Sequence, residues 1–261
     1  MRRLIAACTV AASSWGAVCF GQGLLPDPPA LVAAAPVAES FRGVLPAHVD
    51  LSAQLPPPRV QRPSRTCVSW AVTYAAGSDA LRRADPAQHL ALLSPAFTYA
   101  LAGGTPTCQR GTSIARTLEV PRTIGALPLE EFAFDGNDCS REPTGEELSR
   151  AARWRIKGWS RVDPQDLGAV KGQLARGRPV IFAMHVGPRF QAHRGGGVFD
   201  TIDTGPGLDG HAMVLVGYDD SREAFRLLNS QGRDWGDNGY AWIGYAAWQQ
   251  ATRGGHGFVI D

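Results

Sequence analysis

The sequence predicts an α+β fold of two lobes, and three observations support this class. Helical patterns fill the chain from residue 67 to about residue 150. Strand-like segments separated by Gly and Asp turns fill residues 151–261. The chain has 261 residues, 44% of them hydrophobic, which is enough for one large domain or for two lobes that share a core. We therefore expect a helical lobe at about 64–150, a β lobe at about 151–261, and a cleft between them.

The helical half shows clear start signals. Ser94 and Pro95 are a cap and first-turn pair, and Thr144 and Glu147 have the spacing of a capping box. Apolar residues at helical spacing follow Cys67. We expect helices over residues 67–84, 94–103, 111–120 and 144–154.

The second half combines one helix with buried strands. Residues 163–177 are amphipathic, with Asp163 as the expected N-cap and Gly177 as the expected end. The strands are rich in Val, Leu, Phe and Trp and are bounded by turn residues. We expect strands over residues 155–163, 178–186, 195–200, 211–219, 224–230 and 239–245.

The N-terminus resembles a secretory signal peptide. Arg2 and Arg3 precede a short apolar stretch that ends in small residues near residue 21. This stretch is too short and interrupted for a membrane span. We predict a signal peptide over residues 1–21 and a secreted or periplasmic protein; a misassigned start codon is the alternative. The proline-rich residues 22–63 are predicted to form an extended leader on the surface of a 64–261 domain.

Export would leave three cysteines in the mature chain. Cys108 and Cys139 lie in polar, turn-rich segments of the kind that a disulfide holds together. Cys67 stands at a predicted helix start and is the candidate free thiol. Three reduced thiols are the alternative.

Composition argues against several function classes. The net charge of +2 and the lack of basic clusters do not indicate a nucleic-acid partner. No cofactor motif is recognised, because the stretch GGTPTCQRG lacks the ending of a phosphate loop. Apart from His211, the histidines are scattered without metal-ligand spacing. We expect a monomer with no metal, no cofactor and no membrane span.

Cys67 and His211 together indicate nucleophilic catalysis. A histidine at the start of a buried strand, taken alone, is more often a core residue. A thiol at a helix N-terminus feels the partial positive charge of unpaired N–H groups, which favours the thiolate. A nearby imidazolium would favour it further. Such a pair attacks a carbonyl as thiolate and protonates the leaving amine as imidazolium.

Two amide side chains complete this candidate site. Asn229 ends a strand that we expect to pair with the His211 strand through a hairpin at residues 219–223, so its oxygen would orient the ring. Gln61 lies six residues before Cys67 and would, with the Cys67 backbone N–H, bind an oxyanion.

Three motifs, which follow one another along the chain in the family's order, resemble the papain-like cysteine peptidases, in particular compact bacterial members. LLNSQGRDWGDNGYAWIGY resembles the family's Asn-Ser-Trp-Gly signature, GHAMVLVGYDD its histidine strand, and QRPSRTCVSWAVTYA its Gln and Cys spacing. The resemblance spans residues 45–261. It implies a helical lobe with Cys67 and an antiparallel, barrel-like β lobe with His211 and Asn229.

The resemblance also implies a role for each site residue. Cys67 would be the nucleophile, His211 the acid and base, Asn229 the orienting residue and Gln61 the oxyanion donor. Cys108–Cys139 matches a family-like disulfide. Substrate-binding positions would be Gly111, Ala183 and Ala212, and we expect Trp235 near the cleft as a further one.

The sequence departs from the family pattern in places. Gln231 replaces the tryptophan that shields the His–Asn bond, so we expect that bond to be more exposed to water. Arg62 replaces a glycine. Val68 follows the cysteine where the family has tryptophan, and Trp70 is displaced. A shifted alignment would put Ser69 at the nucleophile position in an inactive chain.

We predict a cysteine peptidase that cleaves peptide bonds through a thioester. Two alternatives remain open. The first alternative is a weakly active or inactive peptide-binding relative, as Gln231 and Arg62 would allow. The second is another Cys-His enzyme, such as a cell-wall amidase or a transglutaminase.

Overall fold

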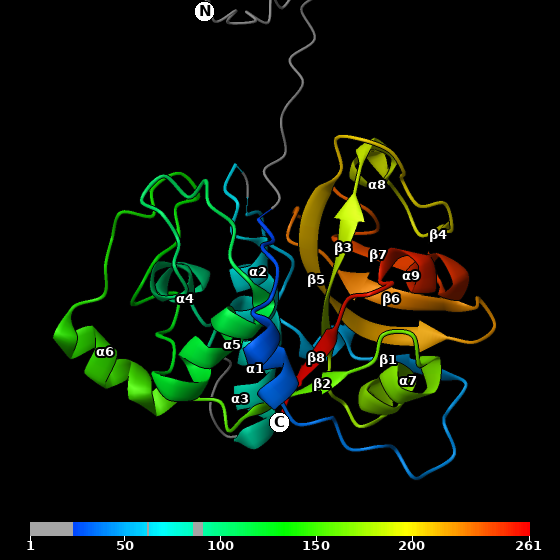
Figure 1. The fold of residues 1–261 in the computed structure, drawn as a ribbon, viewed down its shortest axis with the longest axis horizontal. Helices are drawn as coiled ribbons and strands as arrows, with labels where there is room; N and C mark the ends of the chain where they lie inside the picture. The colour runs from blue at the N-terminus through cyan, green and yellow to red at the C-terminus, as the bar shows by residue number, and fades with distance from the viewer. Residues whose placement is uncertain (1–22, 62, 86–90) are drawn as a thin grey trace, which may run out of the picture.

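The computed structural model describes residues 23–61, 63–85 and 91–261. The predicted signal peptide, Arg62 and His89 lie outside these residues. The described chain forms a helical lobe and a β lobe with a long central helix between them, as Figure 1 shows. In the described part of the chain, no helix has the length and apolar character needed to span a bilayer.

The helices and strands follow the predicted division into two halves. Residues before β2 are mainly helical, and most strands come after it. The helices are α1 (Pro29–Ala34), η1 (Ser52–Gln54), α2 (Cys67–Ser69), η2 (Trp70–Gly77), α3 (Ser78–Ala84), α4 (Pro95–Leu101), α5 (Ile114–Thr123), α6 (Gly145–Ala151), η3 (Ala152–Trp154), α7 (Leu167–Ala175), α8 (Pro188–Ala192) and α9 (Tyr245–Ala251). The strands are β1 (His48–Asp50), β2 (Trp159–Val162), β3 (Val180–Val186), β4 (Val198–Phe199), β5 (Asp209–Asp219), β6 (Ala224–Leu228), β7 (Tyr240–Gly244) and β8 (Gly257–Ile260).

The central helix runs without a break from Cys67 to Ala84, as predicted. Its middle section, η2, is wound as a π-helix, which the sequence did not indicate. Every residue from Cys67 to Ala80 is buried, because the helix is covered by both lobes. Cys67 therefore begins the helix at the place where the two lobes meet.

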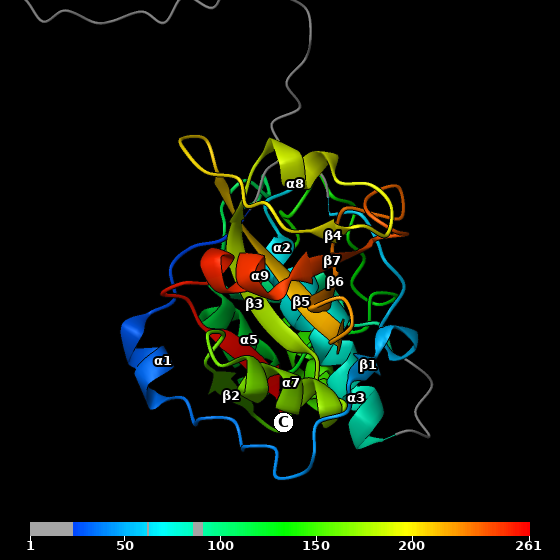
Figure 2. The same ribbon diagram turned by 90° about the vertical axis from the view of Figure 1, so that its right-hand side faces the viewer.

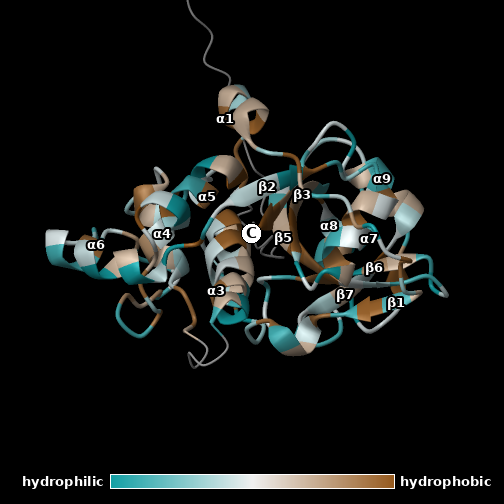
Figure 3. Ribbon diagram, turned by 90° about the horizontal axis from the view of Figure 1, so that it is seen from below, coloured by the Kyte–Doolittle hydropathy of each residue, from teal (hydrophilic) through white to brown (hydrophobic). Residues whose placement is uncertain are grey.

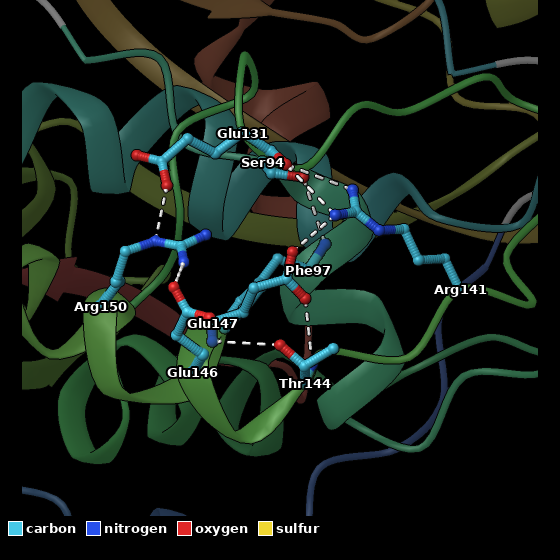
Figure 4. Close-up of polar contacts among 8 residues, drawn as sticks. All are labelled: Ser94, Phe97, Glu131, Arg141, Thr144, Glu146, Glu147 and Arg150. Carbon is cyan, nitrogen blue, oxygen red and sulfur yellow. Dashed lines mark hydrogen bonds and ion pairs between the residues drawn. The ribbon is translucent and has the colours of Figure 1, made fainter.

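The caps of the helical lobe confirm the predicted start signals. Ser94 accepts a hydrogen bond from the Phe97 amide, which starts α4. Thr144 and Glu147 form the predicted capping box at α6, and Arg141 donates to Glu147 at 2.6 Å. Figure 4 shows this cluster of polar contacts. Local side-chain bonds thus set where these helices begin.

One predicted cap is wrong. Asp166, not Asp163, caps α7, because its carboxylate accepts from the Ala169 amide at 2.9 Å. Asp163 instead accepts from the Gln165 amide and forms the turn that precedes the helix. Gly177 follows the helix end with a φ of +75°, as the predicted stop requires.

The β lobe is one eight-stranded sheet in the order β2-β8-β3-β5-β6-β7-β4, with β1 paired to β5. Pairing is antiparallel except between β4 and β7, and in the described part of the chain the end strands β2 and β4 do not pair with each other, so the barrel-like sheet is open. The predicted hairpin joins β5 and β6, with Asp219 opposite Ala224. Figure 2 views the sheet from the side that α7 and α9 cover. Strand β8 and helices α8 and α9 were not predicted.

The main core lies between the central helix and the sheet. It includes Val68 and Val72 of the helix together with Phe182, Val214 and Leu227 of the strands. A smaller core around Phe97 and Phe132 belongs to the helical lobe alone. Figure 3 shows hydrophobic residues on β5, the strand of the β lobe that contacts the central helix. The shared core fixes the lobes relative to one another.

The predicted leader is built into both lobes and is not a loose surface strand. Residues 36–38 hydrogen-bond along Arg161 of β2, and β1 pairs with residues 217–219 of β5. Helix α1 packs near α5 at the boundary of the lobes (Figure 1). Before α1, the chain passes the start of the central helix.

The disulfide between Cys108 and Cys139 forms as expected and closes a separation of 31 residues. A loop of this size contributes about 3–4 kcal/mol by the chain-entropy relation. We expect Cys139→Ser to lower the free energy of unfolding by about that amount, as measured by urea denaturation. The wild type in reductant is the matched control and should fall to the same value. An unchanged midpoint in both would show that the bridge is not formed in solution.

Candidate active site

Cys67 lies fully buried at the first turn of the central helix. Its sulfur accepts a hydrogen bond from the Gly23 backbone N–H at 3.2 Å. The amides of Cys67, Val68 and Ala212 also approach the sulfur. Ala212 directly follows His211 on β5, so the helical lobe's thiol and the β lobe's histidine strand meet here.

His211 and Asn229 form the predicted pair. The ring Nε2 lies 2.7 Å from Asn229 Oδ1, so the amide oxygen accepts and the proton sits on Nε2. The same oxygen accepts from the Ser230 amide at 2.8 Å, which fixes its orientation. The hairpin explains the geometry, because Asn229 follows the end of β6 beside the start of β5. The tautomer leaves Nδ1 as the ring's basic nitrogen.

Gln61 is buried beside this pair. Its side-chain oxygen accepts from the Ser230 hydroxyl at 2.5 Å, and its Nε2 donates to the Ser64 carbonyl at 3.0 Å. Its backbone N–H also donates to the Ser230 carbonyl. Gln61 is therefore held against the residue that follows Asn229.

Ser69 does not fit the nucleophile position. Its hydroxyl is buried in the helix and has no hydrogen-bond partner among the described residues. The contacts with Gly23 and Ala212 belong to Cys67. The shifted alignment is therefore disfavoured.

The His–Asn bond is not exposed to water as we expected from Gln231. His211 is 0% and Asn229 2% exposed. Gln231 is itself buried, and its amide donates to the Gln191 side chain at 2.7 Å. Helix α8 supplies both Gln191 and Phe190, whose ring lies 6.4 Å from the His211 ring.

A short part of the leader covers this site. We call residues 23–27 the cleft segment. Thr112 donates to the Gly23 carbonyl at 3.0 Å and accepts from the Leu25 amide at 2.8 Å, so the segment pairs with it like a strand. A Cβ at Gly111 would lie 2.7 Å from the Gly23 backbone. The segment thus lies on the backbone that we predicted would pair with substrate.

Comparisons with known proteins agree with this geometry. The model of the papain family cysteine proteases matches residues 68–252. This chain belongs to the papain family. The match covers well over half of the chain and contains His211 and Asn229.

Solved structures share the fold of this papain-family chain. Xylellain, a cysteine protease from Xylella fastidiosa, has a TM-score of 0.78 at 24% identity, covering 97% of this chain and 99% of xylellain. Procathepsin L 3 from the Tenebrio molitor larval midgut has a TM-score of 0.72 at 17% identity, covering 94% and 77% of the two chains.

Curated relatives match shorter parts. "Gamete and mating-type specific protein A" of Dictyostelium discoideum is 29% identical over 112 residues, which are 42% of this chain and 24% of that protein. Cathepsin B-like protease 1 of Arabidopsis thaliana is 40% identical over 81 residues, which are 30% and 20% of the two chains. The matches thus span about a quarter or less of those relatives.

The thiol of this papain-family chain is not poised as the sequence suggested. Burial raises the pKa of Cys67 above its ordinary value, against the lowering effect of the Ala212, Gly23 and Val68 amides. We expected the helix N-terminus to favour the thiolate. With the cleft segment in place, desolvation is the larger effect.

The predicted substrate positions have different surroundings. Ala183 lines a pocket beneath the cleft segment, and Ala212 contacts the thiol through its amide. Trp235 does not line that pocket. It is 1% exposed, and its ring packs on Phe190 with centroids 4.9 Å apart, so it supports α8; its role in substrate binding stays a prediction.

Sequence reasoning missed Thr112 and the cleft segment as parts of this site. Thr112 follows Gly111 directly, so its position beside the predicted substrate strand could have been predicted from the sequence. The cleft segment carried no signal, because Gly23 and Leu24 meet the site only through long-range pairing.

Proposed function

We propose that the chain is a cysteine peptidase that hydrolyses peptide bonds and is closed by its own cleft segment. Cys67 is the nucleophile, His211 the acid and base, Asn229 the orienting residue and Gln61 an oxyanion donor. The observation that carries the proposal is the meeting of the Cys67 sulfur with the strand of a histidine whose ring is held by Asn229. Family membership agrees with it.

The chemistry needs one proton shared between sulfur and imidazole. The Cys67 thiolate attacks the scissile carbonyl carbon and forms a C–S bond, while Gln61 and the Cys67 amide bind the resulting oxyanion. His211 then gives its proton to the leaving amine as the C–N bond breaks. Water, losing a proton to His211, hydrolyses the thioester and returns the free thiol.

Substrate and cleft segment compete for the same place. The segment's Gly23 sits on the sulfur, and its backbone uses Thr112. A substrate chain needs both, so the segment must leave before turnover. The closed chain is therefore a latent form of the enzyme.

The compartment remains part of the proposal. Disulfides persist in oxidising compartments, and the Cys108–Cys139 bridge agrees with an extracellular or periplasmic place. We propose that an N-terminal signal directs export. Mass determination of the N-terminus of the exported protein tests this point, and a retained residue 1 would contradict it.

The pH dependence of thiol alkylation tests the closed state. Burial raises the pKa of Cys67, so the Cys67 thiol of the closed chain is protonated at neutral pH. It loses its proton only as the pH rises. We expect iodoacetamide to label Cys67 slowly at pH 6 and faster above the ordinary thiol pKa of about 8.5. Free cysteine is the reference thiol. Faster labelling of Cys67 than of free cysteine at pH 6 would contradict a closed, protonated site.

The reaction class is tested with three substrates side by side. The chain carrying Leu24→Ser, which loosens the cleft segment, is incubated with casein, with peptidoglycan, and with casein plus a primary amine as acyl acceptor. The proposal expects new peptide termini from casein and no amine incorporation. Release of cell-wall peptides alone, or amine transfer alone, would replace the peptidase by an amidase or a transglutaminase.

A further inference from the structure

A large pocket lies directly beneath the cleft segment. Its volume is about 650 Å³, and one wall is the segment itself, from Leu24 to Asp27. The other walls come from α1, β2, β3, the start of α5 and residues 251–256 before β8. Leu24, which lines the pocket, directly follows Gly23, whose backbone N–H donates to the Cys67 sulfur at 3.2 Å.

The end of the pocket nearest the sulfur is apolar. Leu24 packs against the main core, and its Cβ lies 3.0 Å from where a Cβ on Gly210 would be. Gly210 lies against Leu24 and precedes His211, and Ala183 lines the pocket. Small residues here leave room for the leucine side chain.

The rest of the pocket is basic. Its lining contains Arg161, His185, Arg253 and His256, and Asp27 of the cleft segment is the carboxylate among the lining residues. Arg161 Nε is buried without a hydrogen-bond partner among the described residues. No carboxylate of the described residues forms an ion pair with Arg161, His185 or Arg253.

Asp27 marks where an anion fits. Its carboxylate accepts from the Ala115 amide at 2.7 Å at the start of α5. Burial raises its pKa, while the Ala115 amide and the charge of His256 oppose the rise. When the cleft segment leaves, this carboxylate leaves with it, and the basic side chains remain without an anion.

We propose that this pocket selects peptide substrates that carry an aspartate or glutamate near an aliphatic residue. The substrate's aliphatic side chain takes the place of Leu24, and its carboxylate takes the place of Asp27 near His256, in the pocket that Arg253 and Arg161 also line. This inference rests on the proposed peptidase function and names its substrate class.

Matched peptides that differ only in charge test it. The full chain carrying Leu24→Ser and Asp27→Asn, which loosen the cleft segment, is assayed on fluorogenic peptides with Leu beside the scissile residue and Glu or Gln at each neighbouring position. We expect kcat/KM for the Glu peptide to exceed that for the Gln peptide about tenfold at one position, as removal of a partly buried charge pair implies. The ratio should fall at high salt.

Pocket variants locate the effect. Adding His256→Gln or Arg253→Gln should lower the Glu/Gln ratio toward one, whereas Arg153→Gln, an exposed arginine outside the pocket, should leave it unchanged. Equal rates for Glu and Gln peptides at every position, in an enzyme that cleaves both, would overturn the substrate class alone. Absence of cleavage of every peptide, with Cys67 still alkylated by iodoacetamide, would overturn the peptidase function instead.

Discussion

Leu24→Ser in the full chain is expected to increase the rate at which iodoacetamide labels Cys67 about tenfold at pH 7. The side chain of Leu24 packs against the core beside Gly210. Because Leu24 is only partly buried, losing its packing costs about 1.5 kcal/mol, the low end for an aliphatic side chain, and each 1.4 kcal/mol raises the open population about tenfold. Mass spectrometry of the labelled chain over time measures the rate.

Leu25→Ser is the matched control. Leu25 is 38% exposed and holds its place through its backbone bond to Thr112, which the substitution keeps. Its labelling rate should match the wild type within about twofold. Equal rates for the two variants would show that the leucine pocket does not hold the segment, and the latent state would need another cause.

Cys67→Ala, introduced into the Leu24→Ser chain, is expected to reduce peptide hydrolysis by about 10⁴-fold or more. Without a nucleophile no thioester forms, and the remaining groups catalyse poorly. The measurement is kcat/KM on a fluorogenic peptide, with Leu24→Ser alone as the reference. Circular dichroism and the thermal midpoint show whether the fold is kept.

Ser69→Ala in the same background separates the two candidate nucleophiles. Ser69 is buried two residues further along the helix. Its loss should leave kcat/KM within about threefold, since it touches no reacting group in the proposed mechanism. Activity that survives Cys67→Ala but is lost in Ser69→Ala would reverse the assignment.

Much of the fold could be predicted from local patterns. The capping residues Ser94 and Thr144 act through bonds to amides three residues away, so sequence spacing alone identifies them. The β5–β6 hairpin follows in the same way from two apolar runs around a short turn. Asp163 shows the limit of this reasoning, because two aspartates three residues apart can both precede a helix and only the backbone path selects the cap.

The site was predictable where side-chain chemistry marks it. A thiol at a helix start, a histidine at a strand start and an asparagine at the end of the next strand are recognisable in one dimension. The cleft segment is different. Gly23 meets Cys67 44 residues away, and Leu24 meets Gly210 across the whole domain. Such contacts depend on how the lobes pack, which no local pattern encodes.

By itself the sequence determined which side chains are candidates for the reacting groups and where most of the helices and strands of the two halves lie, because propensity, capping and turn chemistry act over a few residues. The tertiary structure decided the rest. It buried the Cys67 thiol under Gly23 and raised its pKa, kept the His211–Asn229 bond away from water despite Gln231, and gathered Arg161, Arg253 and His256 around one pocket. Burial and charge are sums over neighbours from distant parts of the chain, so they exist only once the two lobes have closed on their common core.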